Sequence, residues 1–429
     1  KQMIGYHRAI KKGVQDIDPK IYNEDLHMSQ IGYNNKMKLD IQKNNVWIFG
    51  FGAAGKWASD NINSNVKGFI DSGAAKHGHK YSDLVVYSPE EAQKLIEGDD
   101  VILVTVLDIQ DVIPVVDNKF PGNKWYALGE HITDQNADLN LTDESNEFIE
   151  YTLKAVEMCH KSFLNKDNKF LHSVDIVISE KCTLNCKDCA NLMQYYEDAQ
   201  NIDYDMVVRD FENLVSKIEH VFEVRLIGGE PFINKDIYKI IDYFLASPKI
   251  TKLVIYTNAT IPLKAKLMKE YVTPKLVFAI TDYGDLSKNT NKVTDLLAEM
   301  NIAYRALPPN NWTDSAGIGD QKRTEEGMVD IFETCCGKNL FTIMYGKLYR
   351  CPFVANAERL HAIPFDEKNG VDLTGSIENI VEYTTQIKYL PSCNFCNGRS
   401  HDAPEIIPAI QAKGKLPFKK YINIAVATS

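Results

Sequence analysis

The sequence predicts an α/β protein with two units of alternating strands and helices, followed by a cysteine-rich segment. Three observations support this prediction. Short apolar strands alternate with helices over residues 45–140, the alternation resumes at residue 170, and residues 330–400 are rich in cysteine, glycine, proline and aromatic side chains. Such alternation is typical of parallel sheets covered by helices. A chain of 429 residues accommodates two to three domains of ~150 residues each.

The composition is that of an ordinary globular protein, with 44% hydrophobic and 25% charged residues. A net charge of −10 disfavours nucleic-acid and membrane-surface binding, which depend on Lys and Arg. The longest strongly apolar run, residues 101–107, is far shorter than the ~20 residues of a membrane helix, and the first residues do not look like a signal peptide. We therefore expect a cytoplasmic protein without nucleic-acid or membrane partners. Its nine cysteines are expected to be thiols or metal ligands.

The first unit, residues 45–140, follows an expected helical lead-in over residues 1–44. A helix start is indicated at Ser88, which is followed by Pro89 and, three residues after the cap, by Glu91. Apolar strands alternate with the helices; the strands are expected at 46–49, 66–70 and 101–104, and a helix at 56–62. These features predict a small Rossmann-like parallel α/β domain.

A glycine loop joins the first strand of this unit to its first helix. Gly50, Gly52 and Gly55 form Gly-x-Gly-x-x-Gly, and Asp71 ends the next strand about 20 positions later. Such glycines, with a helix N-terminus, hold a phosphate, and the acid binds a ribose or another diol. The stretch 68–71 also resembles small domains of bacterial polysaccharide enzymes. A nucleotide or nucleotide-sugar site and a docking module without a ligand are equal alternatives, with NAD as a further candidate.

An amphipathic linker helix is expected within residues 141–169, because Ile149, Leu153 and Val156 recur at helical spacing. The second unit then follows. Its strands are expected at 174–178, 224–227, 252–256, 276–280 and 303–306, with helices such as 204–218 and 236–245 between them.

Three cysteines come directly after the first strand of the second unit. Cys182, Cys186 and Cys189 are spaced Cys-x3-Cys-x2-Cys. Three thiolates on one loop can hold three irons of a [4Fe–4S] cluster and leave the fourth iron without a protein ligand. A zinc knuckle is the alternative, but zinc sites usually combine two separated Cys-x2-Cys pairs.

A second motif follows the next strand, where the chain reads Gly228, Gly229, Glu230 and Pro231. Together the two motifs resemble the radical S-adenosylmethionine (radical SAM) superfamily, with the resemblance covering residues 170–400. It implies a partial (β/α)6 TIM-like barrel over residues 170–325, with SAM bound to the open iron and to these four residues. A 5′-deoxyadenosyl radical would then take a hydrogen atom from the substrate.

Further SAM contacts are expected where two later strands end. Thr257 and Asn258 close one strand, and Thr281 and Asp282 close the next. Polar groups at the carboxyl ends of barrel strands suit the ribose and the methionine carboxylate. The superfamily usually has an aromatic residue before the third cysteine, and Asp188 stands there in this chain. Packing against the adenine is therefore expected from another residue.

A second cysteine set lies in the C-terminal segment. It resembles the shortened, twitch-like form of the SPASM extension, which implies an auxiliary [4Fe–4S] domain over residues 326–429 ligated by Cys336, Cys351, Cys393 and Cys396. Cys335 fits as well as Cys336, and the spare thiol is either buried packing or a hydrogen-atom donor. Zinc is the competing metal.

The resemblance, together with the Rossmann-like unit that precedes the radical SAM-like unit, implies an oxidoreductase or epimerase. The expected substrate is a small sugar or nucleotide-sugar, and the expected reductant is of the flavodoxin or ferredoxin type. Dehydrogenation and epimerisation remain open. The alternatives are a peptide-modifying radical SAM enzyme and a non-enzymatic iron–sulfur electron carrier or redox sensor.

Overall fold

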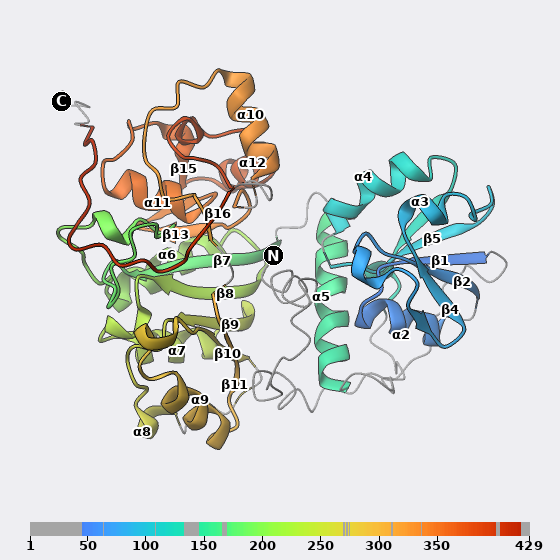
Figure 1. Ribbon diagram of the computed structural model, residues 1–429, viewed down its shortest axis with the longest axis horizontal. Coiled ribbons are helices and arrows are strands. Elements are labelled where there is room, and N and C mark those ends of the chain that lie inside the picture. The colour runs from blue at the N-terminus through green and yellow to red at the C-terminus, as the bar shows by residue number, and fades with distance from the viewer. Residues whose placement is uncertain are drawn as a thin grey trace. The chain divides into compact units, whose positions relative to one another are not determined.

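The computed structural model describes residues 45–62, 64–107, 109–132, 146–164, 170–268, 271, 273, 275–309, 312–335, 337–399 and 404–421. The expected lead-in over residues 1–44, and Cys336, lie outside the described residues. The described chain forms two compact units, residues 45–164 and 170–421 (Figure 1). Both combine parallel strands with helices, so the predicted α/β class is confirmed. No described helix is both long and apolar enough to cross a membrane.

The first unit is built on a six-stranded sheet with the order β3-β4-β2-β1-β5-β6. All neighbouring strands are parallel except β3 and β4. The first described strand, β1, lies in the middle of the sheet. Strands β2 to β4 are added on one side of β1, and strands β5 and β6 on the other, as in doubly wound sheets. The strands are β1 (Asn45–Phe49), β2 (Asn65–Ile70), β3 (Lys80–Tyr81), β4 (Leu84–Tyr87), β5 (Val101–Val104) and β6 (Lys124–Ala127).

Two apolar cores form in this unit because successive strand side chains point to opposite faces. On β1, Ile48 packs in one core and Trp47 and Phe49 in the other. The helix expected as a linker is α5, whose Leu153 and Val156 pack in the core of Ile48. It therefore belongs to the first unit. The helices are α2 (Ala53–Asn61), α3 (Pro89–Ala92), α4 (Ile109–Lys119) and α5 (Asn146–Leu164).

The second unit is built on an eight-stranded sheet with the order β11-β10-β9-β8-β7-β13-β14-β15. The strands β7 to β11 are parallel and neighbours in chain order. They match the five strands expected from the sequence. Whether this sheet forms a partial barrel remains a prediction. The bounds are β7 (Phe170–Ser179), β8 (His220–Gly228), β9 (Ile250–Thr257), β10 (Leu276–Thr281), β11 (Ala303–Leu307), α6 (Tyr204–Val215), α7 (Ile237–Ala246), α8 (Ala265–Met268) and α9 (Thr290–Glu299).

The C-terminal segment continues this sheet. The strand β13 pairs in parallel with β7, and β14 and β15 follow in antiparallel fashion. The segment therefore shares the sheet and core of the strands before it. A separate pair, β12 and β16, is antiparallel. The bounds are β12 (Trp312–Thr313), α10 (Glu325–Thr334), β13 (Thr342–Met344), β14 (Lys347–Tyr349), α11 (Pro352–Arg359), β15 (Gly370–Asp372), α12 (Ile377–Thr385) and β16 (Glu405–Ile406).

Candidate functional site

The loop after β7 carries the first cysteine set at the carboxyl edge of the parallel strands. Cys182, Cys186 and Cys189 are all free thiols. Burial raises the pKa of each thiol, to about 12 for Cys182, and repulsion from neighbouring thiolates adds to the rise for Cys182 and Cys186. Three thiols in this environment become thiolates readily only if a cation neutralises them, as a bound metal does. The donor set therefore fits an iron–sulfur cluster on this loop.

The two glycines at the end of β8 allow the backbone to lie against this cysteine loop. The Gly229 amide donates to the Ser179 carbonyl at 2.9 Å, and the Glu230 amide to the Lys181 carbonyl at 2.8 Å. A Cβ on Gly229 would stand 2.2 Å from the Lys181 oxygen, and one on Gly228 would stand 2.1 Å from the Ser179 oxygen. The backbone of both glycines therefore packs closely against the residues that lead into the cysteine loop.

Glu230 lies in a buried network that ties β8 to the end of β9. Its carboxylate accepts hydrogen bonds from the Thr257 hydroxyl, at 2.9 and 3.0 Å, and from the Asn258 amide, at 2.8 Å. It also accepts from the Phe232 amide at 3.1 Å. Burial nevertheless raises the pKa of Glu230 to about 7. Glu230 and Thr257 are therefore engaged with each other, and Pro231 is buried at the start of the following turn.

Asn258 connects this network to the cysteines. Its Nδ2 lies 3.7 Å from the Cys182 sulfur and 3.2 Å from the Thr183 hydroxyl, so it donates toward both. Its Oδ1 accepts from the Thr260 amide at 3.0 Å. Of the two residues expected at the end of β9, Asn258 is therefore the one that reaches the cysteine loop.

The end of β10 adds an aromatic residue that the sequence did not single out. Burial raises the pKa of Tyr283, and the charge of all three thiolates adds to the rise. The Trp312 ring meets it edge-on at 6.1 Å. Thr281 and Asp282 are half-buried at the same strand end, and Asp282 accepts from the Gly284 amide at 2.9 Å.

The second cysteine set comes together in the C-terminal segment. Cys335 caps the end of α10 and Cys351 the start of α11, while Cys393 lies in a short 3-10 turn, Pro391–Asn394, and Cys396 follows that turn. Burial raises the pKa of Cys351, Cys393 and Cys396, and the charge of Cys335 contributes to each rise. The structure thus places Cys335 with the other three, whereas Cys336 lies outside the described residues.

Two arginines, Arg323 and Arg399, act on these cysteines. Arg323 donates to the carbonyl oxygens of Cys393 and Cys396 at 2.6 and 2.8 Å, which fixes the turn between them. Burial raises the pKa of Cys189, Cys351 and Cys396, and in each case the Arg399 guanidinium opposes the rise. The charge of Arg399 therefore acts on members of both sets.

In the first unit, the three loop glycines differ in their surroundings. Gly50 has φ +121°, and a Cβ on it would stand 2.7 Å from Val106 Cγ1. A Cβ on Gly55 would stand 1.9 Å from the Gly50 oxygen, whereas a Cβ on Gly52, the N-cap of α2, would meet no atom of the described residues within 4 Å. The first and third glycines thus serve the turn and close packing, and the second leaves the helix N-terminus accessible.

Asp71, the acid expected to bind a diol, is held by its own loop. Its carboxylate pairs with the Lys76 ammonium at 2.7 Å and accepts from the amides of Gly73 and Phe51 at 2.8 and 3.0 Å. Burial acts to raise the pKa of Asp71, but Lys76 and these hydrogen bonds outweigh it, so the pKa is lowered. A ligand hydroxyl would have to share the carboxylate with these partners, and nucleotide binding remains a prediction.

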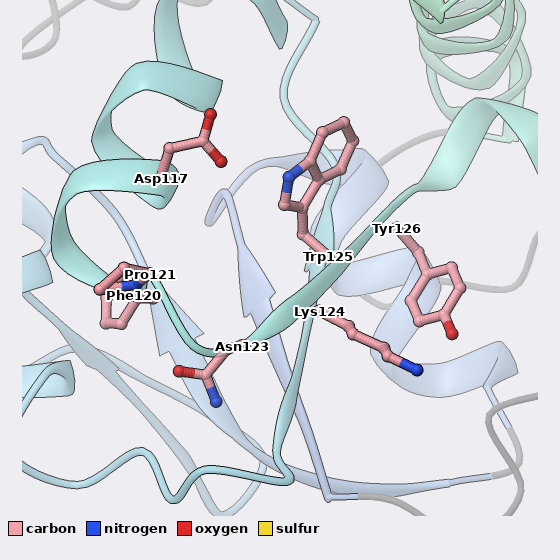
Figure 2. Close-up of a pocket in the computed structure, with 7 residues that line it drawn as sticks. All are labelled: Asp117, Phe120, Pro121, Asn123, Lys124, Trp125 and Tyr126. Carbon is pink, nitrogen blue, oxygen red and sulfur yellow. The ribbon is translucent and has the colours of Figure 1, made fainter.

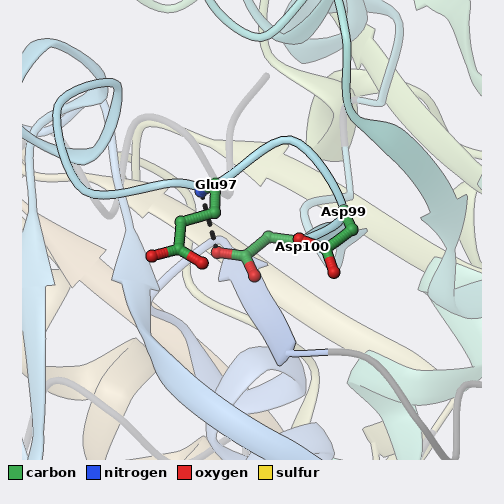
Figure 3. A group of neighbouring side chains, drawn as sticks. All are labelled: Glu97, Asp99 and Asp100. Atoms are coloured by element: carbon green, nitrogen blue, oxygen red, sulfur yellow. Dashed lines mark hydrogen bonds between the residues drawn. The ribbon is translucent and has the colours of Figure 1, made fainter.

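Two other features of the first unit lie away from the glycine loop. Figure 2 shows a surface pocket of about 410 Å³ at the end of α4 and the start of β6. Figure 3 shows Glu97, Asp99 and Asp100, whose carboxylates lie close together. Asp100 accepts hydrogen bonds from Asn45 and Trp47, which gives it a structural role.

Comparison with known proteins identifies a family for part of the second unit. Residues 176–302 match the model of the Radical SAM superfamily, a stretch that includes the first cysteine set. GTP 3′,8-cyclase of Syntrophomonas wolfei subsp. wolfei is 26% identical in an alignment of 144 residues that covers 29% of this chain. The chain spans only 42% of that relative's length. The radical SAM identity predicted from the motifs is therefore supported over this stretch.

Three solved structures are similar at low identity. BtrN in complex with AdoMet and 2-DOIA is 16% identical with a TM-score of 0.35, covering 52% of this chain and 85% of BtrN. Streptococcus suis SuiB bound to precursor peptide SuiA is 15% identical with a TM-score of 0.28, covering 53% of this chain and 48% of SuiB. The anSMEcpe structure with bound AdoMet and Cp18Cys peptide is 12% identical with a TM-score of 0.35, covering 50% and 81%.

Proposed function

We propose that this chain is a radical SAM enzyme whose Cys182, Cys186 and Cys189 hold a [4Fe–4S] cluster with one iron open to SAM. The convergence of three thiols, of which Cys186 is buried and the other two are half-buried, at the carboxyl edge of the parallel strands within the stretch 176–302 carries the proposal. When bound, the cluster and SAM supply a 5′-deoxyadenosyl radical that removes a hydrogen atom from substrate. The protein supplies position and excludes water.

We propose a separate role for each of the residues around the loop. Glu230 and Thr257 fix the end of β9, so that Asn258 can hold the loop through Cys182. Thr281 and Asp282 are proposed to bind the polar end of SAM. Tyr283 is proposed to pack against the adenine, in place of the aromatic residue missing at position 188.

The second cysteine set is proposed to hold one auxiliary [4Fe–4S] cluster on Cys335, Cys351, Cys393 and Cys396. Four thiolates ligate such a cluster fully, so its proposed role is to accept one electron from a substrate radical. The net reaction is then an oxidation, with a flavodoxin- or ferredoxin-type protein supplying the starting electron. An epimerase would instead need a thiol to return a hydrogen atom.

The proposed substrate is a carbohydrate linked to a nucleotide. The support comes from the glycine loop of the first unit, where Gly52 leaves the N-terminus of α2 accessible to a phosphate. Binding of a UDP-sugar to the full chain tests this point. Gly52→Val should weaken binding at least tenfold, whereas Gly98→Val, at an exposed glycine with nothing within 4 Å, should not. Equal binding by both variants would contradict a nucleotide site on this loop.

The radical chemistry is tested on protein reconstituted without oxygen. We expect about eight irons per chain for two four-iron clusters, and 5′-deoxyadenosine after addition of SAM and dithionite. Cys186→Ala should lose about half of the iron and all of the 5′-deoxyadenosine. Full iron content without any 5′-deoxyadenosine would contradict the enzyme and favour an electron carrier. Deuterium from solvent in the product would indicate epimerisation.

A further inference from the structure

A segment near the C-terminal end of the described chain lies along the first cysteine loop. We refer to residues 409–418 as the C-terminal strap. Cys186 and Gln411 form an antiparallel bridge. The Lys187 amide donates to the Ile410 carbonyl at 2.8 Å, and the Ala412 amide donates to the Asn185 carbonyl at 2.7 Å. The strap therefore pairs with the cysteine loop by backbone hydrogen bonds on both sides of Cys186.

The side chain of Gln411 contacts a cysteine sulfur directly. Its Nε2 donates to the Cys186 Sγ at 3.2 Å and to the Ala409 carbonyl at 2.8 Å. Its Oε1 accepts from the Asn185 amide at 2.8 Å. These partners fix the orientation of the amide, since the reversed amide would set its NH2 against the Asn185 N–H. Cys186 is buried while Gln411 is exposed, so a surface side chain makes this contact with the sulfur.

The strap has anchors that do not depend on Gln411. Lys415 Nζ donates to the Met193 carbonyl at 3.0 Å, and the Leu416 amide donates to the Gln194 carbonyl at 2.9 Å. The Phe418 ring meets the Tyr195 ring edge-on at 5.5 Å. A substitution at the exposed Gln411 should therefore leave the strap in place and the chain folded.

We propose that Gln411 is a positioning residue of the first cysteine loop, which clamps the loop through Asn185 and raises the reduction potential of the cluster through Cys186. The inference rests on the proposed function, because it assumes a cluster on this loop. A reduced cluster carries one more negative charge than an oxidised one. A hydrogen-bond donor to a ligand sulfur therefore stabilises the reduced form more, and such bonds are among the determinants of cluster potential.

The potential is measured by redox titration of the loaded protein, followed at the electron paramagnetic resonance signal that changes when SAM is added. At a fixed applied potential, Gln411→Ala should lower the ratio of reduced to oxidised cluster about tenfold. This corresponds to a reduction potential that is lower by about 59 mV for a one-electron couple. Gln411→Glu should lower it further, because a carboxylate replaces the donor. Lys413→Arg, which keeps the charge of an exposed strap residue, should leave it unchanged. A wild-type potential in Gln411→Ala overturns the potential effect.

The effect of Gln411 on the loop, through its hydrogen bond with the Asn185 amide, is measured separately on metal-free protein by amide hydrogen exchange. The Asn185 amide should exchange at least tenfold faster in Gln411→Ala, because its acceptor is lost. Gln411→Glu keeps an acceptor oxygen and should retain slow exchange. Unchanged exchange in Gln411→Ala overturns the clamp whether or not a cluster binds. Absence of any SAM-dependent signal in the wild-type protein would instead count against the proposed function, and the exchange result would still stand.

Discussion

The hydroxyl of Thr257 lies 2.9 and 3.0 Å from the two carboxylate oxygens of Glu230, so the end of β9 is tied to the motif after β8. Both residues were expected to bind SAM. In the structure they bind each other in a buried network, and Asn258 beside them reaches Cys182. The two residues are therefore partners of each other, and their binding to SAM remains a prediction.

This network makes stability depend on pH. Burial raises the pKa of Glu230 from an ordinary 4.5 to about 7. Between these values the folded protein holds the proton more tightly than the unfolded chain, so stability falls as pH rises through this window and levels off above it. Urea unfolding of metal-free protein from pH 4.5 to 8 should show a loss of at most roughly 3 kcal/mol. Glu230→Gln should remove this contribution and leave that of Asp175, whose pKa burial raises to about 6; an unaltered pH profile in that variant would contradict the prediction.

Gly229→Ala should damage the cysteine loop. The added Cβ would stand 2.2 Å from the Lys181 oxygen and 2.7 Å from Cys182 Cβ, so the loop must move. We expect a loss of about 1–3 kcal/mol in the free energy of unfolding and reduced iron uptake by the first set. Gly319→Ala is the matched control, because a Cβ there meets only Gln321 Nε2 at 3.9 Å. The prediction is wrong if both variants load iron equally.

Tyr283 should contribute to SAM affinity through its ring. Tyr283→Leu should weaken SAM binding by about 5- to 100-fold, within the ~1–3 kcal/mol measured for stacking of a base on an aromatic side chain. Tyr283→Phe keeps the ring and should bind SAM like the wild type. Equilibrium binding to the loaded protein measures this. Equal affinities for the Leu and Phe variants would exclude the proposed packing against adenine.

Cys335 and Cys336 should differ in their effect on iron content. Cys335 lies with Cys351, Cys393 and Cys396, so Cys335→Ser should lower the iron content from about eight to about four per chain. Cys336→Ser should keep all of it. Iron and sulfide analysis after anaerobic reconstitution decides between them, and the opposite pattern would return the ligand to Cys336.

Much of the fold could be predicted because its signals are local. The strand runs, the Gly-x-Gly-x-x-Gly loop and the helix start at Ser88 each occupy a few consecutive residues, and the Ser88 capping box is present in the structure. The role of α5 could be predicted only in part. Its apolar face was visible in the sequence, but only the folded chain shows that this face packs in the core of the first unit.

The closeness of Cys182, Cys186 and Cys189 in space was determined by the sequence alone, because three residues on one short loop must lie near one another in any fold. The tertiary structure alone decided which distant side chains meet them. Gln411 reaches Cys186 across 225 positions and Arg323 reaches Cys393 across 70, and no local pattern marks either residue. Hydrogen bonds of this kind depend on how strands and loops come together in space, and that arrangement is set by the packing of the whole sheet.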